Sequence, residues 1–438
     1  MLDMAGWSPR STARGNPLAV YCSKKHTVPI EDNEMSEYKG IEYLRRKLMS
    51  KRTRIDLRYA YYDMKHMAND LKISTPPDLQ WLMSVLGWCG TAVDSIADRL
   101  DFGRFRNDAF NLTGIYQMNN QDVLVDSLIL DALISACSFN YITQGADGFP
   151  AMRAVEARNA TGIIDPITYM LKEGYAILDV DEYGLPITEV YVIPHRTDIY
   201  ENGKFVRSWK HPAPYPLLVP IIYRPDAKRP FGHSRISRAC MSIQDSACRT
   251  VKRSEIAAEF YSYPQRYVLG MDPDAERMDK WKVTMSAMFR VDKDEDGDHP
   301  VVGQFPQQSM APHTEQLKMF ASAFAGETGL TVDDLGFPGV NPSSYESIKA
   351  SHETLRRTAR KAQKKFAVGL MNAGYLAACI RDGQDYKRSQ LYETEPVWNP
   401  IFEPDLSDLA GVGDAVQKIQ SAFPDYFDES KLYELTGI

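Results

Sequence analysis

The sequence predicts an α+β protein of several structural units. Its 438 residues allow about two to four units, at roughly 100–200 residues per domain. Three observations support this class. Apolar residues recur at helical spacing in the first third, alternating and β-branched residues dominate 150–233, and long helical stretches return after residue 234. Hydrophobic residues at 44% and charged residues at 25% exclude disordered, collagen-like and disulfide-scaffold classes for most of the chain.

The first part of the chain is predicted to be helical after a tail. Residues 1–35 mix Gly, Ser, Pro, Lys and Arg without periodicity, which predicts a flexible tail. Apolar spacing then predicts helices over 38–71, 79–100 and 123–139. Residues 150–233 predict a sheet, because short β-branched runs alternate with Gly, Pro and Asp. Within it, 199–206 reads as a hairpin that closes at Asn202-Gly203.

The second half is predicted to contain two helices around a small β insert, followed by a long helix. The first helix begins at Ser234, a good N-cap residue, and runs to about Tyr261. Strand signals at 266–269, 288–291 and 301–302 follow. Further helices are predicted over 312–326, over 343–380 and from 405 onwards.

Charge and cysteine usage limit the functional classes. Fifty-one Lys and Arg against 58 Asp and Glu give a formal net charge of −7, so tight wrapping of nucleic acid by charge neutralisation is not expected. Six scattered cysteines without a C-x-x-C motif predict reduced thiols. We expect no signal peptide at the polar N-terminus. We also expect no membrane span, because Asp126 and Asp131 interrupt the most apolar stretch.

Enzyme motifs are weak. Asp292, Asp294 and Asp296 copy the first half of an EF-hand calcium loop, but Gly303 stands where the bidentate Glu belongs. A solvated acidic hairpin tip is therefore the favoured interpretation of this loop. We find no phosphate-binding loop and no dinucleotide fingerprint, and we expect no cofactor, no metal site and no catalytic residue. The alternative is a metal-dependent nucleic-acid-processing enzyme that uses the acidic loop 292–298.

The predicted long helix carries a basic face. Over residues 343–365 it has seven Lys and Arg against two Glu. Four of the basic residues fall on one helical face: Lys349, Arg356, Arg360 and Lys364. The opposite face is apolar, with Leu355, Ala359, Ala362, Phe366 and Leu370. The basic face is either a solvated or salt-bridged surface or a contact with phosphate backbone.

Several segments in the second half, in the same order, resemble the SPP1-like family of tailed-phage portal proteins. The segments are Val219-Pro-Ile-Ile-Tyr-Arg-Pro, Gly232-His-Ser-Arg-Ile, Tyr263-Pro-Gln-Arg-Tyr-Val-Leu-Gly, Trp398-Asn-Pro and Asp414-Ala-Val-Gln-Lys. None is specific alone, and the resemblance rests on their shared order over about 215–438. The N-terminal half fits by pattern only. The crown is short for the family, and the N-terminal tail has no family counterpart.

The resemblance implies a structural protein, not an enzyme. It implies a homo-oligomeric ring, usually a dodecamer, at one capsid vertex of the virion, made in the host bacterial cytoplasm. Double-stranded DNA would be packaged and ejected through its central channel. The terminase large subunit, a head-completion or adaptor protein, and capsid and scaffolding proteins would bind the ring. It implies no contact with a membrane.

The resemblance also implies an anatomy. The segments are a tail (1–35), wing (36–233), stem helix (234–262), clip (263–311), stem helix (312–327), tunnel loop (328–342), wing with long helix (343–400) and short crown (401–438). At the loop, Asn341, Ser343 and Ser344 would face the DNA channel. Lys349, Arg356, Arg360 and Lys364 would face phosphate or a neighbouring subunit. Asp292, Asp294 and Asp296 would contact a partner at the clip.

Overall fold

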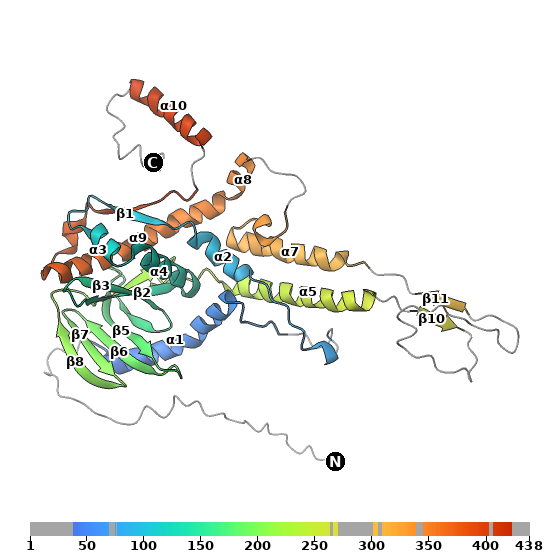
Figure 1. Cartoon of the computed structure of the whole chain (residues 1–438), viewed down its shortest axis with the longest axis horizontal. Coiled ribbons are helices and arrows are strands. Elements are labelled where there is room, and N and C mark those ends of the chain that lie inside the picture. Colours follow the sequence, from blue (N-terminus) through green and yellow to red (C-terminus); the bar gives the residue numbers. More distant parts are fainter. Residues whose placement is uncertain are drawn as a thin grey trace, which may run out of the picture. The chain divides into compact units, whose positions relative to one another are not determined.

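The chain folds into a mixed structure of helices and sheets, as the sequence predicts (Figure 1). It is described by a computed structural model, which covers residues 38–69, 75, 77–262, 266–269, 301–304, 309–338, 345–402 and 406–422. The helices are α1 (Ile41–Tyr62), η2 (Pro77–Leu79), α2 (Trp88–Ala97), α3 (Leu112–Met118), α4 (Gln121–Ser135), α5 (Arg238–Ser262), α7 (Ala311–Thr328), η3 (Asp333–Leu335), α8 (Tyr345–Ser351), α9 (Glu353–Asp382), η4 (Arg388–Leu391) and α10 (Leu406–Ala422).

The strands of the described residues form four antiparallel sheets. The strands are β1 (Phe102–Arg106), β2 (Cys137–Gln144), β3 (Pro150–Glu156), β4 (Ala160–Ile164), β5 (Leu171–Val180), β6 (Pro186–Ile193), β7 (Arg196–Glu201), β8 (Lys204–Lys210), β9 (Leu218–Ile222), β10 (Arg266–Leu269), β11 (Val301–Gln304) and β12 (Glu395–Trp398). The larger sheets have the orders β4-β5-β6-β7-β8 and β3-β2-β9, and β1-β12 and β10-β11 form two-stranded sheets. The sheet predicted over 150–233 is therefore confirmed.

The Asn202-Gly203 hairpin is confirmed in detail. Glu201 pairs with Lys204 at the end of the β7–β8 ladder. Asn202 and Gly203 have φ values of 49° and 76°. Positive φ at both central positions is the type I′ requirement, which Asn and Gly meet at low cost.

Two helices in the first part are shorter than predicted. The helix expected over 38–71 ends at Tyr62, and Met64 follows with a positive φ of 58°. The helix expected over 79–100 forms only from Trp88 to Ala97. Residues 80–87 instead lie along α5, because the Lys252 ammonium donates to the Gln80 carbonyl at 3.2 Å and the Ser84 hydroxyl donates to Glu255 at 3.1 Å. Tertiary contacts thus override helical spacing here.

The helix predicted over 123–139 also ends early. α4 stops at Ser135, Ala136 has a φ of 92°, and β2 begins at Cys137. The apolar run continues through this boundary because both elements are buried. A continuous apolar run cannot by itself distinguish a buried helix from a buried strand.

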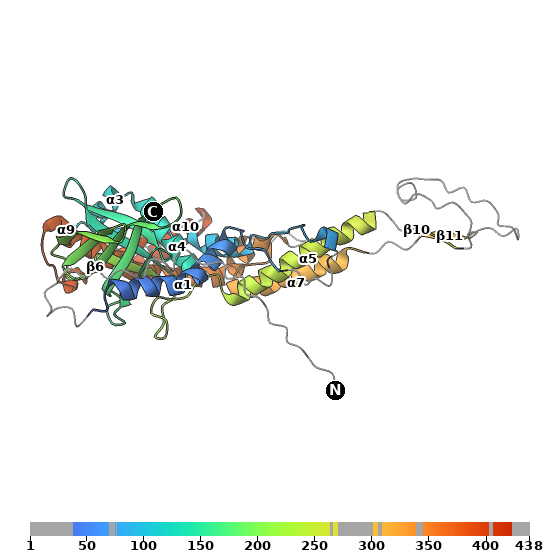
Figure 2. The same cartoon turned by 90° about the horizontal axis from the view of Figure 1, so that it is seen from below.

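The predicted helix pair around a β insert is present. α5 and α7 pack side by side, as both views show (Figure 2). The predicted strands at 266–269 and 301–302 are confirmed as β10 and β11, and the expected strand at 288–291 lies outside the described residues. The predicted cap is wrong, because the Ser237 hydroxyl, not Ser234, accepts from the Cys240 amide at 3.2 Å. The Ser234 hydroxyl instead donates to the Ile134 carbonyl at 2.5 Å.

The predicted long helix over 343–380 is interrupted. α8 ends at Ser351, and α9 begins at Glu353 with His352 as its N-cap residue. His352 has φ −91° and ψ 7°, outside the helical range, so the chain changes direction there.

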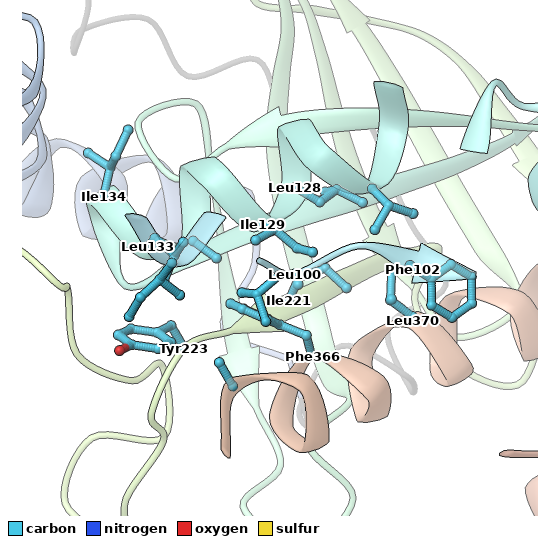
Figure 3. Close-up of a cluster of buried hydrophobic side chains, with 14 of the residues drawn as sticks. Leu100, Phe102, Leu128, Ile129, Leu133, Ile134, Ile221, Tyr223, Phe366 and Leu370 are labelled. Atoms are coloured by element: carbon cyan, nitrogen blue, oxygen red, sulfur yellow. The ribbon is translucent and has the colours of Figure 1, made fainter. Parts of the chain in front are cut away.

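The largest hydrophobic cluster is built by helices that include α4 and α9 and by strands β2 and β9 of the three-stranded sheet. Figure 3 shows Leu128, Ile129 and Leu133 of α4 on one side of this cluster, and Phe366 and Leu370 of α9 on the other. A second cluster fills the space between the two larger sheets. Among the residues covered by the structure, no helix is long and apolar enough to cross a bilayer.

Candidate nucleic-acid interface

Two of the predicted sets of site residues lie outside the described part of the chain. They are the channel candidates Asn341, Ser343 and Ser344, and the acidic-loop candidates Asp292, Asp294 and Asp296. The structure describes the third set. Lys349 is half-buried on α8, whereas Arg356, Arg360 and Lys364 lie on α9.

The apolar face of α9 is buried as predicted. Its five predicted residues are all buried: Leu355, Ala359, Ala362, Phe366 and Leu370. Gly369 allows close contact with β9, because a Cβ there would lie 2.6 Å from Ile221 Cδ1 and 3.0 Å from the Pro220 carbonyl oxygen. This anchoring fixes which side of α9 faces outward.

The outward side of α9 is strongly basic. We call its six cations the basic face of α9: Arg356, Arg357, Arg360, Lys361, Lys364 and Lys365. All except Arg356 are exposed. Glu353 accepts from Arg357 Nε at 2.9 Å and lies 3.6 Å from Arg356 Nε. The other four cations make no ion pair with any residue that the structure describes.

The basic face can therefore bind an anion from outside the subunit. Over 356–365 the helix is about 13 Å long, at 1.5 Å per residue. Lys and Arg at that density match either phosphate groups or a row of carboxylates on a protein. Lys349 is not part of this row, because the break at His352 separates α8 from α9.

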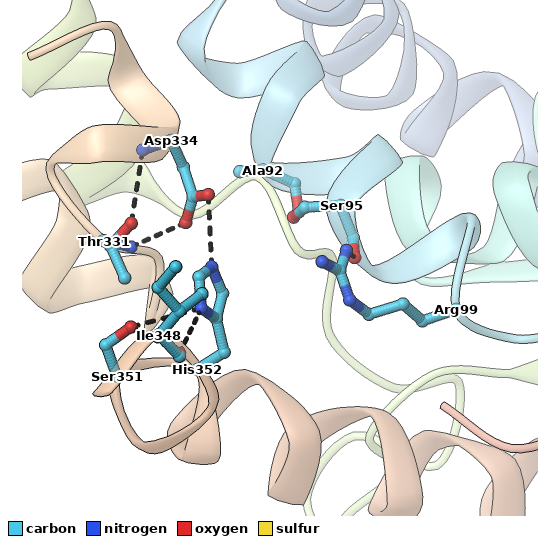
Figure 4. Close-up of polar contacts among 8 residues, drawn as sticks. All are labelled: Ala92, Ser95, Arg99, Thr331, Asp334, Ile348, Ser351 and His352. Atoms are coloured by element: carbon cyan, nitrogen blue, oxygen red, sulfur yellow. Dashed lines mark hydrogen bonds and ion pairs between the residues drawn. The ribbon is translucent and has the colours of Figure 1, made fainter. Parts of the chain in front are cut away.

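The break is held by polar contacts that the sequence analysis did not identify (Figure 4). The Nε2 atom of His352 lies 3.3 Å from Asp334 Oδ1, and its Nδ1 atom lies 2.9 Å from the Ile348 carbonyl oxygen. The Ser351 hydroxyl also lies 3.2 Å from Nδ1, so the ring has a polar neighbour at each of its nitrogens. His352 thus connects the break to η3.

Asp334 also organises the chain that follows α7. The Thr331 amide donates to Asp334 Oδ2 at 2.8 Å, and the Asp334 amide donates to Thr331 Oγ1 at 3.2 Å. Burial opposes ionisation of Asp334, but the Thr331 hydrogen bonds and the His352 contact together lower its pKa. The reciprocal Thr-x-x-Asp pattern was the sequence signal that could have located this turn.

A buried arginine joins α5 and α7 to the rest of the fold. Arg235, just before α5, is 7% exposed. Its guanidinium donates to the Ala92 carbonyl of α2 at 3.1 Å and to the Thr328 carbonyl at the end of α7. Burial lowers the pKa of this group. The two helices also contact each other through Thr250 and Gln316 at 3.3 Å.

The described residues offer no metal centre. Among them, no group of three or more His, Cys, Asp or Glu side chains could hold a metal ion. The acidic loop 292–298, on which the enzyme alternative depends, lies outside the described part.

Comparison with protein families shows to which class of protein this chain belongs. The model of the family "Phage portal protein, SPP1 Gp6-like" matches residues 41–421. The chain belongs to this family. Its role is that of a portal protein, a structural component of phage particles, and nothing in the matches supports the enzyme alternative.

Two curated portal proteins are similar to this chain over most of its length. The portal protein of Mycobacterium phage L5 is 25% identical over 383 residues, which cover 82% of this chain and 77% of the relative. The portal protein of Mycobacterium phage D29 is 26% identical over 384 residues, with the same coverage.

Solved structures of gene transfer agent (GTA) particles are also similar. A chain from the neck of an empty GTA particle, computed with C6 symmetry, has a TM-score of 0.45 at 12% identity and covers 80% of this chain and 90% of its own length. A chain from the neck of a native GTA particle, computed with C12 symmetry, has a TM-score of 0.42 at 15% identity, with coverage of 84% and 95%.

Proposed function

We propose that this portal-family chain assembles into a ring, usually of twelve copies, at one vertex of a phage capsid. Double-stranded DNA passes through the central channel during packaging and ejection. The observation that carries the proposal is the family match over residues 41–421. Energy for transport comes from a separate terminase, because the sequence has no phosphate-binding loop.

The anatomy follows the helix pair. α5 and α7 bracket the β10–β11 ladder in the chain, an order that suits two stem helices (234–262 and 312–327) with a clip (263–311) between them. The tunnel loop (328–342), the two wing segments (36–233 and 343–400) and the short crown (401–438) complete the proposal. In it, the terminase large subunit and a head-completion or adaptor protein bind at the clip, and capsid and scaffolding proteins surround the ring.

Net charge suits a conduit for DNA. Each copy has a formal charge of −7, so twelve copies carry −84. Like charge on the ring and on DNA limits adhesion at low ionic strength, and salt screens this repulsion. In the proposal, weak polar contacts from Asn341, Ser343 and Ser344 guide the moving duplex without holding it.

The proposal leaves two uses for the basic residues Lys349, Arg356, Arg360 and Lys364. They face either phosphate groups of DNA in the channel or a neighbouring subunit. Both uses agree with the exposed position of Arg360 and Lys364.

The mass and symmetry of the purified full chain test this proposal. Twelve copies of 49.6 kDa give a ring of about 600 kDa. Mass photometry with negative-stain class averages should show that mass and a central hole, alone or after co-expression with the phage scaffolding protein. A particle that stays between about 50 and 100 kDa under both conditions contradicts the proposal.

A further inference from the structure

A second charged surface of the chain has the opposite sign to the basic face of α9. Four exposed carboxylates gather where α2 ends and α4 begins: Asp98, Asp101, Asp122 and Asp126. We call them the acidic face. None of the four forms an ion pair with a residue that the structure describes. Asp101 accepts a hydrogen bond from the Asn399 side chain at 2.5 Å.

Three of these carboxylates act on the fourth, Asp126. Partial burial raises the pKa of Asp126 first, and the negative charges of Asp101, Asp122 and Asp98 raise it further. A cation brought to this cluster from outside would relieve the repulsion that acts on Asp126.

The α4 part of the acidic face, Asp122 and Asp126, and the basic face of α9 lie on two helices that share one buried core. Leu128, Ile129 and Leu133 of α4 and Phe366 and Leu370 of α9 belong to one buried cluster, with α4 on one side and α9 on the other (Figure 3). Each helix therefore presents its polar side away from the cluster. Asp98 and Asp101 follow α2, which also contacts α9. Among the described residues, however, no cation of the basic face forms an ion pair with any of the four carboxylates, so both faces stay available to a neighbouring copy.

This arrangement has the form that a ring requires. A closed ring is built from heterologous contacts, in which one surface of a subunit meets a different surface of the next. Charge complementarity between those surfaces selects the register and suppresses wrong pairings. Four cations on α9 and four carboxylates near α2 and α4, none of them in an ion pair with a described residue, provide this complementarity.

DNA is the less suitable occupant of the basic face. Four or more Lys and Arg per copy, repeated around a ring, would release many counterions on contact with the duplex and hold it strongly. Such a grip opposes the free passage of DNA that the proposed function needs. A neighbouring subunit therefore suits the basic face of α9 better than the phosphate groups of DNA do.

We propose that the basic face of α9 docks on the acidic face of a second copy of this chain. The inference rests on the proposed ring, and it names the surfaces that join its subunits. It adds a specific expectation: ring assembly weakens as salt rises, because exposed charge pairs are screened.

Charge reversal on each face tests the inference in the full-length chain. Lys361→Glu with Lys364→Glu reverses the basic face, and Asp98→Lys with Asp126→Lys reverses the acidic face. We expect each pair of substitutions to raise the protein concentration for half-assembly at least tenfold. Combining all four substitutions should restore it to within about threefold of wild type, because the attraction is re-formed with the signs exchanged.

A matched control changes the same charge elsewhere. Lys204→Glu with Lys210→Glu on β8 replaces two exposed cations that lie away from both faces and should leave assembly unchanged. Asp98→Asn with Asp126→Asn, a milder change, keeps the test valid if the reversed protein fails to fold. It should give a smaller loss in the same direction, with an unchanged circular dichroism spectrum of the monomer.

The outcomes separate this inference from the proposed function. If the wild type forms a ring and neither charge-reversal variant changes its assembly, only the inference is overturned. The same holds if each variant weakens assembly but the combined variant does not restore it. Intact rings of the basic-face variant with weaker binding of a fluorescent 30-base-pair duplex would assign α9 to phosphate instead. A wild-type chain that never forms a ring overturns both proposals.

Discussion

At the scale of single residues, Asp334 makes the stability of the region after α7 depend on pH. Its folded-state pKa lies below the ordinary value, so folding favours the ionised carboxylate. The contribution is complete above the unfolded-state pKa of about 4 and is lost as pH falls through the lower folded value. We expect Asp334→Asn to destabilise the protein at pH 7, with the difference from wild type shrinking steadily below about pH 4. Urea unfolding at pH 7, 5 and 3 measures this change.

The exposed neighbour Asp333 provides the control for this prediction. Asp333→Asn removes the same charge one residue away but leaves the Thr331 and His352 contacts in place. Its effect on unfolding should be small and nearly independent of pH. Equal pH profiles for the two variants would contradict the role assigned to Asp334.

Residue-scale features differ in how well sequence anticipates them. The Asn202-Gly203 turn was predictable, because its requirement for positive φ is local and only a few residues meet it. The Asp334–His352 contact joins residues on different elements, and no periodicity marks it. Ser234 was misassigned because Ser237, three residues later, is an equally good cap, and only the structure shows which hydroxyl faces the first turn of α5.

At the scale of elements, Gly369 determines how closely α9 approaches β9. Its missing Cβ would sit 2.6 Å from Ile221 Cδ1 and 3.0 Å from the Pro220 carbonyl oxygen. Gly369→Ala should therefore lower the free energy of unfolding by about 1–3 kcal/mol, the usual cost of overpacking a buried contact. Chemical denaturation at fixed protein concentration measures the change.

The same substitution at Gly326 in α7 should change the free energy of unfolding in the opposite direction. A Cβ there meets no atom within 4 Å, so Gly326→Ala gains helix propensity without a clash. We expect it to raise the free energy of unfolding by roughly 0.5–1 kcal/mol. Two glycine substitutions that changed stability by the same sign and amount would contradict this account of α9 packing.

Element types were predicted better than element ends. The apolar and basic sides of α9 follow from 3.6-residue spacing, which is a property of the helix itself. The start of α2 does not, because residues 80–87 satisfy the same spacing but lie along α5 instead. The end of α4 was missed because Ala136 adopts a left-handed φ that nothing in its side chain predicts.

At the scale of the whole molecule, the family was recognisable before any contact was known. The order of weak segments such as Gly232-His-Ser-Arg-Ile and Trp398-Asn-Pro is a long-range property that survives when each segment alone is uninformative. The relation between the acidic and basic faces is different. It depends on which sides of α4 and α9 share a core, and helical spacing alone does not place two helices in one cluster.

The proposed channel leads to a prediction about the speed of DNA passage. Asn341 stands in the proposed tunnel loop, where a neutral amide offers weak hydrogen bonds to the duplex. Asn341→Lys would place one additional cation per subunit, about twelve per ring, against the phosphate backbone. We expect slower packaging in an assay with purified terminase and proheads, and the slowing should fade as salt screens the new charges. Asn341→Gln, which keeps a neutral amide, is the control and should package at the wild-type rate. A lysine variant that packages as fast as wild type at low salt would place residue 341 away from the moving DNA.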